Sequence, residues 1–200
     1  MKIVFVCTGN QCRSPVAEYV ARSFANELTA QAKTKAPRPA NSPSPELEFA
    51  SAGSRAHRGT PMDPRALRFL AEEGINADGF SSTRLNRAAL AGADIVVGME
   101  TAHVEHALRI APALLIAPAL LKKAATLRQL AAWSAIDSVR FPDDIAHLRA
   151  TRTGKEILDA HGPDIPDPVV ENDDDFMRIS REVRDNVKAL VEAIVNGQDA

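Results

Sequence analysis

The sequence predicts an α/β protein whose small four-stranded parallel sheet is covered by helices on both faces. Short apolar runs of strand length alternate along the chain with longer segments whose apolar residues recur every three or four positions. Such alternation favours parallel strands joined by helical crossovers. The chain has 200 residues, of which 45% are hydrophobic and 25% are charged. A chain of this length and composition can bury a full core.

The first strand and the first helix have the clearest patterns. Residues 2–7 are rich in β-branched and aromatic side chains, as in a buried parallel strand. From Ser14 onward the period becomes that of a helix with one apolar face. The larger residues on that face are Val16, Val20, Phe24 and Leu28. We expect Ser14 to cap this helix and Pro15 to occupy its first position, where a missing N–H costs nothing.

The later elements are expected to follow in the same alternating order. Further strands are predicted at residues 47–52, 93–99 and 113–116. Helices are predicted at residues 63–74, 86–90, 101–110, 121–133, 144–160 and, with a long apolar stripe, 176–194. Pro163, Pro166 and Pro168 predict an extended segment before the last helix.

We expect one domain over residues 1–200 that carries two insertions. Residues 33–46 lose all periodicity and contain four prolines, which predicts an extended surface insertion. Residues 134–163 contain a predicted helix with a polar middle, so they are expected to form an outlying helical insertion. Neither segment has the composition of a boundary between two cores.

Charge and hydropathy exclude several classes of function. The 24 basic and 26 acidic residues give a net charge of −2, so there is no electrostatic basis for binding nucleic acid or a membrane surface. The apolar run at the N-terminus stops at Val6, unlike a signal peptide, and the apolar stretch over 107–121 contains Arg109 and is too short to span a bilayer. Both cysteines lie in one loop and form no disulfide framework. We therefore expect a cytoplasmic protein.

The segment between the first strand and the first helix carries the chemistry. Residues 7–14 read Cys-Thr-Gly-Asn-Gln-Cys-Arg-Ser. A turn of this kind directs backbone N–H groups and the positive end of a helix dipole toward a bound anion. A helix N-terminus and a guanidinium both favour the thiolate form of a cysteine, so Cys7 is a candidate nucleophile. Arg13 offers a planar fork that matches two oxygens of a phosphate.

Two other loop residues fit the same interpretation. Gly9 removes a side chain where the backbone approaches the ligand, and Asn10 tolerates a left-handed conformation. A metal site is disfavoured, because Cys7 and Cys12 have no second pair or clustered histidines to complete a tetrahedral set. A nucleotide-binding P-loop is disfavoured, because the segment lacks Gly-Lys-Ser/Thr. The loop is therefore predicted to hold phosphate for attack by a thiol.

Residues 6–15 resemble the signature of the low-molecular-weight protein tyrosine phosphatases. Similar segments follow at residues 51–53, 61–66 and 93–99. Asp167-Pro168, followed by residues 172–176, resembles the general-acid loop and final helix of that family. The resemblance covers most of the chain apart from residues 33–46 and 134–163.

The resemblance implies a phosphatase that works through a cysteinyl-phosphate intermediate, with no metal or other cofactor. Cys7 would attack phosphorus while Arg13 and the loop amides hold the oxygens. Asp167 would protonate the leaving oxygen and then activate water. The residues implied to contact the substrate are Thr8, Gly9, Asn10, Gln11, Cys12 and Ser14. The substrate would be a phosphorylated protein or a small phosphomonoester, without nucleic acid or membrane as a partner.

Several points stay open at the level of sequence. Asp164 competes with Asp167 as the acid, although the Asp-Pro pair favours Asp167. Cys12 either packs in the loop or, as the resemblance implies, traps oxidised Cys7 as a disulfide. Val169 and Val170 stand where the family often has two tyrosines, which leaves the preference for aryl groups open.

An arsenate reductase that uses an external low-molecular-weight thiol is the alternative function. That related family shares the thiol–arginine loop, but an Asp-Pro pair such as Asp167-Pro168 is not expected in it. The histidines have no spacing that demands a catalytic role and are expected at the surface or in packing. They are His57, His103, His106, His147 and His161.

Overall fold

The computed structural model describes residues 1–35, 47–110, 123–136, 139–151, 162 and 164–197. The strand predicted at 113–116 and most of the proline-rich segment lie outside the described residues. The helix predicted over 144–160 is described only in its first half, where α7 spans Ile145–Thr151.

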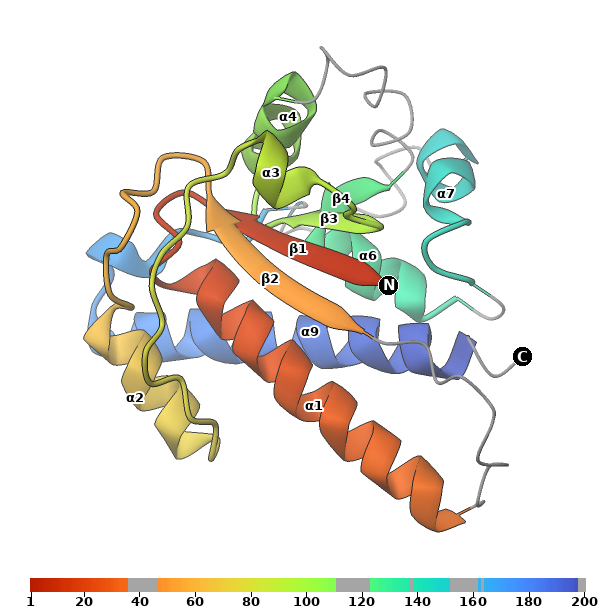
Figure 1. The fold of residues 1–200 in the computed structure, drawn as a ribbon, viewed down its shortest axis with the longest axis horizontal. Helices are drawn as coiled ribbons and strands as arrows, with labels where there is room; N and C mark the ends of the chain where they lie inside the picture. The colour runs from red at the N-terminus through yellow and green to blue at the C-terminus, as the bar shows by residue number, and fades with distance from the viewer. Residues whose placement is uncertain (36–46, 111–122, 137–138, 152–161, 163, 198–200) are drawn as a thin grey trace.

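Four parallel strands form one sheet in the order β2-β1-β3-β4 (Figure 1). Their bounds are Lys2–Cys7 for β1, Glu48–Gly53 for β2, Ile95–Gly98 for β3 and Ala124–Thr126 for β4. The chain crosses from β1 to β2 on one side and then places β3 on the other side of β1. In open α/β sheets, ligands bind beyond the carboxyl ends of the strands where the strand order reverses, and here that point lies at the end of β1.

The two faces of β1 enter two different hydrophobic clusters. Ile3 and Phe5 face the larger cluster, whereas Val4 and Val6 face the smaller one. Helices on the larger side are α1 (Arg13–Lys35), α2 (Pro64–Glu72), α6 (Leu127–Ser134) and α9 (Asp173–Gly197). Helices on the smaller side are α3 (Arg87–Leu90) and α4 (Thr101–Ile110). In Figure 1 α1 and α9 lie across one face of the sheet and α4 lies on the opposite side, so the predicted fold class is confirmed.

The apolar stripes predicted for the first and last helices form the core between α1 and α9. Val16 and Val20 of α1 are buried, as are Val183 and Val187 of α9. The start of α1 differs in detail from the prediction: the helix begins at Arg13, so Ser14 lies inside it and its hydroxyl is directed at Cys7 instead of capping. Among the described helices, none is long and apolar enough to cross a membrane.

The segment after residue 122 corrects one prediction. Residues 124–126 were expected within a helix over 121–133, but they form β4, the edge strand beside β3. The helix α6 begins only at Leu127, with Thr126 as its N-cap in a capping box with Gln129. Two of the three residues in this strand are alanines, which favour a helix and give no alternation of polar and apolar side chains. Pairing with β3 therefore decides the structure there.

Candidate active site

The predicted loop lies at the carboxyl end of β1, at the point where the strand order reverses. Cys7 ends β1 and is buried, and α1 begins six residues later. Asn10 has a positive φ of 53°, the left-handed conformation expected for it. The loop is held from the side by β2 and the segment after it, because Ser54 N–H donates to Cys7 O and Arg55 N–H donates to Thr8 O, both at 2.9 Å.

Two polar groups of the loop contact the sulfur of Cys7. The backbone N–H of Asn10 lies 3.2 Å from Sγ, and Ser14 Oγ lies 2.9 Å from it. Ser14 Oγ accepts from the Asn10 side chain at 3.0 Å, and its own proton has two acceptors within reach, Cys7 Sγ and the carbonyl of Ala52 at 3.4 Å. The sulfur therefore has one backbone donor and one hydroxyl in direct contact.

The side chain of Asn10 ties the loop to two neighbouring segments. Its Oδ1 accepts from Thr83 N–H at 2.7 Å, and its Nδ2 donates to Ser51 Oγ at 2.8 Å. Ser51 in turn donates to the buried carboxyl of Glu18, which also pairs with Arg22. Burial raises the pKa of Glu18, and the hydrogen bond from Ser51 acts against that rise. The loop that contains Cys7 is therefore fixed by a chain of buried polar groups.

Gly53 is a positioning residue that sequence reasoning did not single out as part of the site. A Cβ placed on it would lie 2.7 Å from Thr8 O and 2.8 Å from Asn10 N. Both atoms belong to the loop backbone, so no side-chain rotation can make room. By contrast, a Cβ on Gly9 would contact only the flexible side chain of Gln11, at 3.4 Å, so the described structure does not itself require glycine there.

Arg13 is 2% exposed and meets three acceptors from two segments. One terminal nitrogen donates to Glu100 and, at 2.7 Å, to the carbonyl of Ile165. The other pairs with the carboxylate of Asp167 at 2.8 Å. The buried Nε has no hydrogen-bond partner among the described residues. A buried donor in an anion-shaped loop is suited to an oxygen of a bound phosphate.

The two aspartates that competed in sequence occupy different places. Asp167 reaches Arg13 and is 40% exposed at the side chain. Asp164 instead accepts from the backbone N–H and hydroxyl of Thr101, at 2.6 and 2.8 Å, at the start of α4. The structure thus brings Asp167 to the loop and uses Asp164 to cap a helix.

Glu100 and His103 belong to the site, although the sequence analysis did not select them. His103 Nδ1 accepts from Glu100 N–H and its Nε2 lies 3.0 Å from Thr8 Oγ1, so Nε2 carries the proton and donates to Thr8. Burial lowers the pKa of His103 to about 4, and Arg13 adds to this although Glu100 opposes it. A neutral imidazole therefore supports the loop. Their position just beyond β3 was the available signal, since the carboxyl ends of parallel strands meet at one edge.

Cys12 and Gln11 contact the turn that precedes α2. Cys12 Sγ is 3.7 Å from Asp63 Oδ2, and Gln11 O accepts from Asp63 N–H at 3.0 Å. Burial raises the pKa of the Cys12 thiol, and the charge of Asp63 raises it further. Cys7 and Cys12 are both free thiols. The choice between packing and a redox role for Cys12 stays a prediction.

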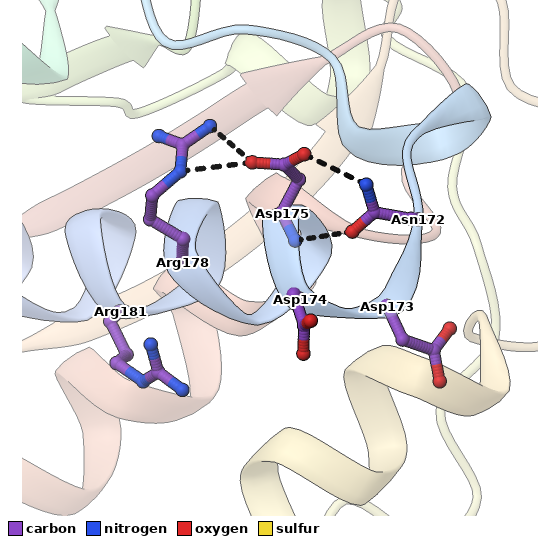
Figure 2. Close-up of a pocket in the computed structure, with 6 residues that line it drawn as sticks. All are labelled: Asn172, Asp173, Asp174, Asp175, Arg178 and Arg181. Atoms are coloured by element: carbon purple, nitrogen blue, oxygen red, sulfur yellow. Dashed lines mark hydrogen bonds and ion pairs between the residues drawn. The ribbon is translucent and has the colours of Figure 1, made fainter.

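The rim near Asp167 is aliphatic and open. Val169 is 53% exposed and Val170 is 86% exposed, in the short 3₁₀ turn η2 over Pro168–Val170. A surface hollow lies further on, at the start of α9 (Figure 2). Its groups bond one another: Asn172 accepts from Asp175 N–H, and Arg178 pairs with the carboxylate of Asp175. That hollow contains none of the predicted site residues.

The fold is that of an α/β protein in which a buried thiol, a buried arginine and the carboxylate paired with that arginine lie at the carboxyl end of a parallel sheet. The chain belongs to the low molecular weight phosphotyrosine protein phosphatase family, whose model matches residues 2–133. This match confirms the resemblance noted in the sequence. Because the matching family is one of phosphatases, the arsenate reductase alternative is not supported.

Individual relatives agree with this assignment. The chain is 30% identical over 110 residues to the low molecular weight protein-tyrosine-phosphatase Wzb of Escherichia coli (strain K12). That match covers 55% of this chain and 62% of the relative, so the chain spans less than two thirds of its length.

Solved structures show the same fold. The tyrosine phosphatase Wzb from Escherichia coli K30, in complex with sulphate, is 22% identical with a TM-score of 0.63, covering 96% of each chain. The YwlE arginine phosphatase from Geobacillus stearothermophilus is 23% identical with a TM-score of 0.60, covering 99% of this chain and 92% of the other.

Proposed function

We propose that the protein hydrolyses phosphotyrosine or a related phosphomonoester through a cysteinyl-phosphate intermediate. The observation that carries this proposal is the convergence of Cys7, Arg13 and Asp167 from opposite ends of the sequence. A donor-stabilised sulfur, a buried guanidinium with a free Nε and a partly exposed carboxyl meet at one loop. Membership in the phosphatase family supports it.

The first step transfers phosphate to the enzyme. The thiolate of Cys7 attacks phosphorus and forms an S–P bond while the bond from phosphorus to the leaving oxygen breaks. Arg13 and the loop N–H groups hold the other oxygens, where charge is concentrated. The carboxyl of Asp167 gives its proton to the leaving oxygen, so a neutral phenol departs.

The second step regenerates the enzyme. Asp167, now a carboxylate, accepts a proton from water as the water oxygen attacks phosphorus. The S–P bond breaks, inorganic phosphate leaves and the thiolate of Cys7 returns. Ser14 and the N–H of Asn10 stabilise the departing sulfur, because the N–H donates to it and the Ser14 hydroxyl lies 2.9 Å from it in the resting site.

Turnover of an aryl phosphate by the wild type, Cys7→Ser and Asp167→Asn tests this mechanism. We expect Cys7→Ser to lose at least about 10⁴-fold in kcat. We expect Asp167→Asn to lose about 10²-fold. Arsenate reduction with an added thiol is measured alongside and should be absent. Retained turnover in Cys7→Ser would exclude the mechanism.

The substrate class is a separate question, because the rim offers Val169 and Val170 in place of rings. We propose phosphotyrosine on a protein as the substrate. The test compares peptides of one sequence that carry phosphotyrosine, phosphoserine or phosphoarginine, the last because an arginine phosphatase has the same fold. Equal kcat/KM for phosphotyrosine and phosphoserine would contradict the assignment. A nucleophilic thiol must stay reduced, which favours a cytoplasmic location.

A further inference from the structure

Arg65 connects the two halves of the site without lying in it. It is the second residue of α2, and its side chain is 22% exposed. Its Nε and one terminal nitrogen donate to the two carboxylate oxygens of Asp63, at 3.2 and 3.0 Å. The guanidinium also donates to the carbonyls of Val169 at 3.2 Å and Glu171 at 2.9 Å. Its carbon lies 4.3 Å from the centre of the Phe176 ring.

One end of this arrangement is the phosphate loop. Asp63, which orients Arg65, donates its own N–H to Gln11 O and accepts from the thiol of Cys12. Burial acts to raise the pKa of Asp63, but the hydrogen bonds from Arg65 outweigh it and lower that pKa. The pair therefore stays ionised throughout the neutral range.

The other end is the segment that carries the candidate acid. Before Asp167, the chain is anchored at Ile165, whose N–H donates to Met99 O at 2.8 Å and whose carbonyl accepts from Arg13. After Asp167, Val169 and Val170 are exposed and bury little apolar surface. Position there depends on directional bonds. The turn has its own, from Val169 N–H to Asp167 Oδ1 and from Glu171 N–H to Pro168 O, and the two bonds from Arg65 connect it to α2.

We infer that Arg65 is a positioning residue that fixes the Asp167 segment against the phosphate loop. The inference rests on the proposed function, in which Asp167 is the general acid. A planar guanidinium can hold a carboxylate on one edge and two carbonyls on the others, whereas an ammonium is a point charge that cannot. Arg65→Lys should therefore keep the charge pair with Asp63 but lose the hydrogen bonds to the carbonyls that position the Asp167 segment.

The test uses the leaving group as its readout. Loss of proton donation slows the hydrolysis of aryl phosphates whose phenols are weakly acidic. It has less effect when the phenol is acidic, because an acidic phenol departs without a proton. kcat/KM is measured for a series of aryl phosphates whose phenols range from acidic up to tyrosine-like, with a pKa of about 10. We expect Arg65→Lys to lose about 10-fold with the weakly acidic phenols and less than about twofold with the most acidic ones.

The chain offers a matched control one turn further along α2. Arg68 also reaches from α2 to the start of α9, but it pairs with the side chain of Asp173 at 2.9 Å. Figure 2 shows Asp173 directed toward α2 and away from the other pairs of that hollow. Arg68→Lys should keep the wild-type dependence on leaving group.

Two reference measurements separate failure of this inference from failure of the mechanism. Asp167→Asn should show the steepest dependence on the leaving group. If it does while Arg65→Lys follows the wild type, or loses the same factor with every phenol, the inference is overturned and the mechanism stands. If Asp167→Asn shows no change in dependence, both are overturned. Thermal unfolding is recorded for each variant. If Arg65→Met folds, its loss of kcat/KM with the weakly acidic phenols should equal or exceed that of Arg65→Lys. If it does not fold, the result for Arg65→Lys decides the question.

Discussion

The nucleophile side and the acid side of the site are held in different ways. Cys7 lies in a buried loop that Asn10, Ser14 and the chain from Ser51 to Glu18 fix through hydrogen bonds. Asp167 lies beside an exposed turn. Arg13 pairs with the carboxylate of Asp167, and Arg65 donates to backbone carbonyls of the turn. Buried networks lose much when one member is removed, whereas exposed segments tolerate change. We expect substitutions on the first side to damage the enzyme and substitutions on the second to adjust it.

Apart from Cys7 itself, the largest effect is expected from Asn10→Ala. Alanine lacks the polar side chain that lets asparagine adopt a φ of 53°, so the backbone there becomes strained. The substitution also leaves the N–H of Thr83 without its acceptor. We expect kcat/KM to fall about 10³-fold and the free energy of unfolding to fall by about 3 kcal/mol. Steady-state kinetics and urea denaturation measure the two quantities.

Gln11→Ala is the control for that loss, because the Gln11 side chain donates only to Pro61 O at 3.3 Å among its described contacts. Its free energy of unfolding should stay within about 0.5 kcal/mol of the wild type. Equal destabilisation by the two variants would show that the buried network is not what fixes the loop.

Gly53→Ala should have the next largest effect. The added methyl group would meet the backbone of Thr8 and Asn10, so the loop must shift. Displacing a catalytic group by about 1 Å costs about 10²-fold in rate, and we expect a loss of that size in kcat. Ala56 is the third close neighbour of the added methyl group, with its Cβ at 2.7 Å. Ala56→Gly removes that contact and leaves Thr8 O and Asn10 N in place, so the double variant should recover little of the loss. Full recovery in the double variant would show that the contact with Ala56, and not displacement of the loop, causes the loss.

A smaller, pH-dependent effect is expected at His103. Its pKa of about 4 in the fold lies below the ordinary value of about 6.5, so the unfolded chain binds a proton first as the pH falls. The corresponding stability is present above pH 6.5 and is lost toward pH 4. Between pH 7 and pH 5 the wild type should lose about 2 kcal/mol more unfolding free energy than His103→Gln. Urea denaturation at both pH values measures this, and equal losses would mean that His103 titrates normally.

The smallest effect is expected on the acid side, from Val170→Tyr. Val170 is 86% exposed, so the ring disturbs no packing. A ring at the rim adds an aromatic contact worth about 1 kcal/mol, which should lower KM for a phosphotyrosine peptide severalfold while leaving a phosphoserine peptide unchanged. Thermal unfolding should not move. A marked loss of stability would show that the acid side is more rigid than its exposure indicates.

Local motifs made the nucleophile side largely predictable. Cys7 ends the first strand and Arg13 comes six residues later, a spacing that the sequence shows directly. Asn10 takes the left-handed conformation that its residue type suggested. Asp167 was selected over Asp164 from its Asp-Pro pair, and the structure places Asp167 on Arg13. Their catalytic roles stay predictions until kinetics test them.

What could not be predicted depends on contacts between distant segments. Gly53 matters because the register of β2 against β1 brings it to Thr8, and His103 matters because β3 delivers α4 to the same edge. The strand Ala124–Thr126 exists through its pairing with β3 and not through its own propensity. Each of these requires the sheet order, which no local pattern contains.

The packing of α9 on α1 also determines when the site is completed during synthesis. The ribosome makes the thiol and the arginine first, and the acid segment and α9 more than 150 residues later. Val16 and Val20 are buried in the same cluster as α9, so the emerging N-terminal half lacks part of its core. Because the N-terminal end emerges from the ribosome first, a nascent chain carries the proposed nucleophile before the proposed proton donor. Under the proposed mechanism, catalysis therefore becomes possible only late in synthesis, when the acid segment and α9 complete the site and its core.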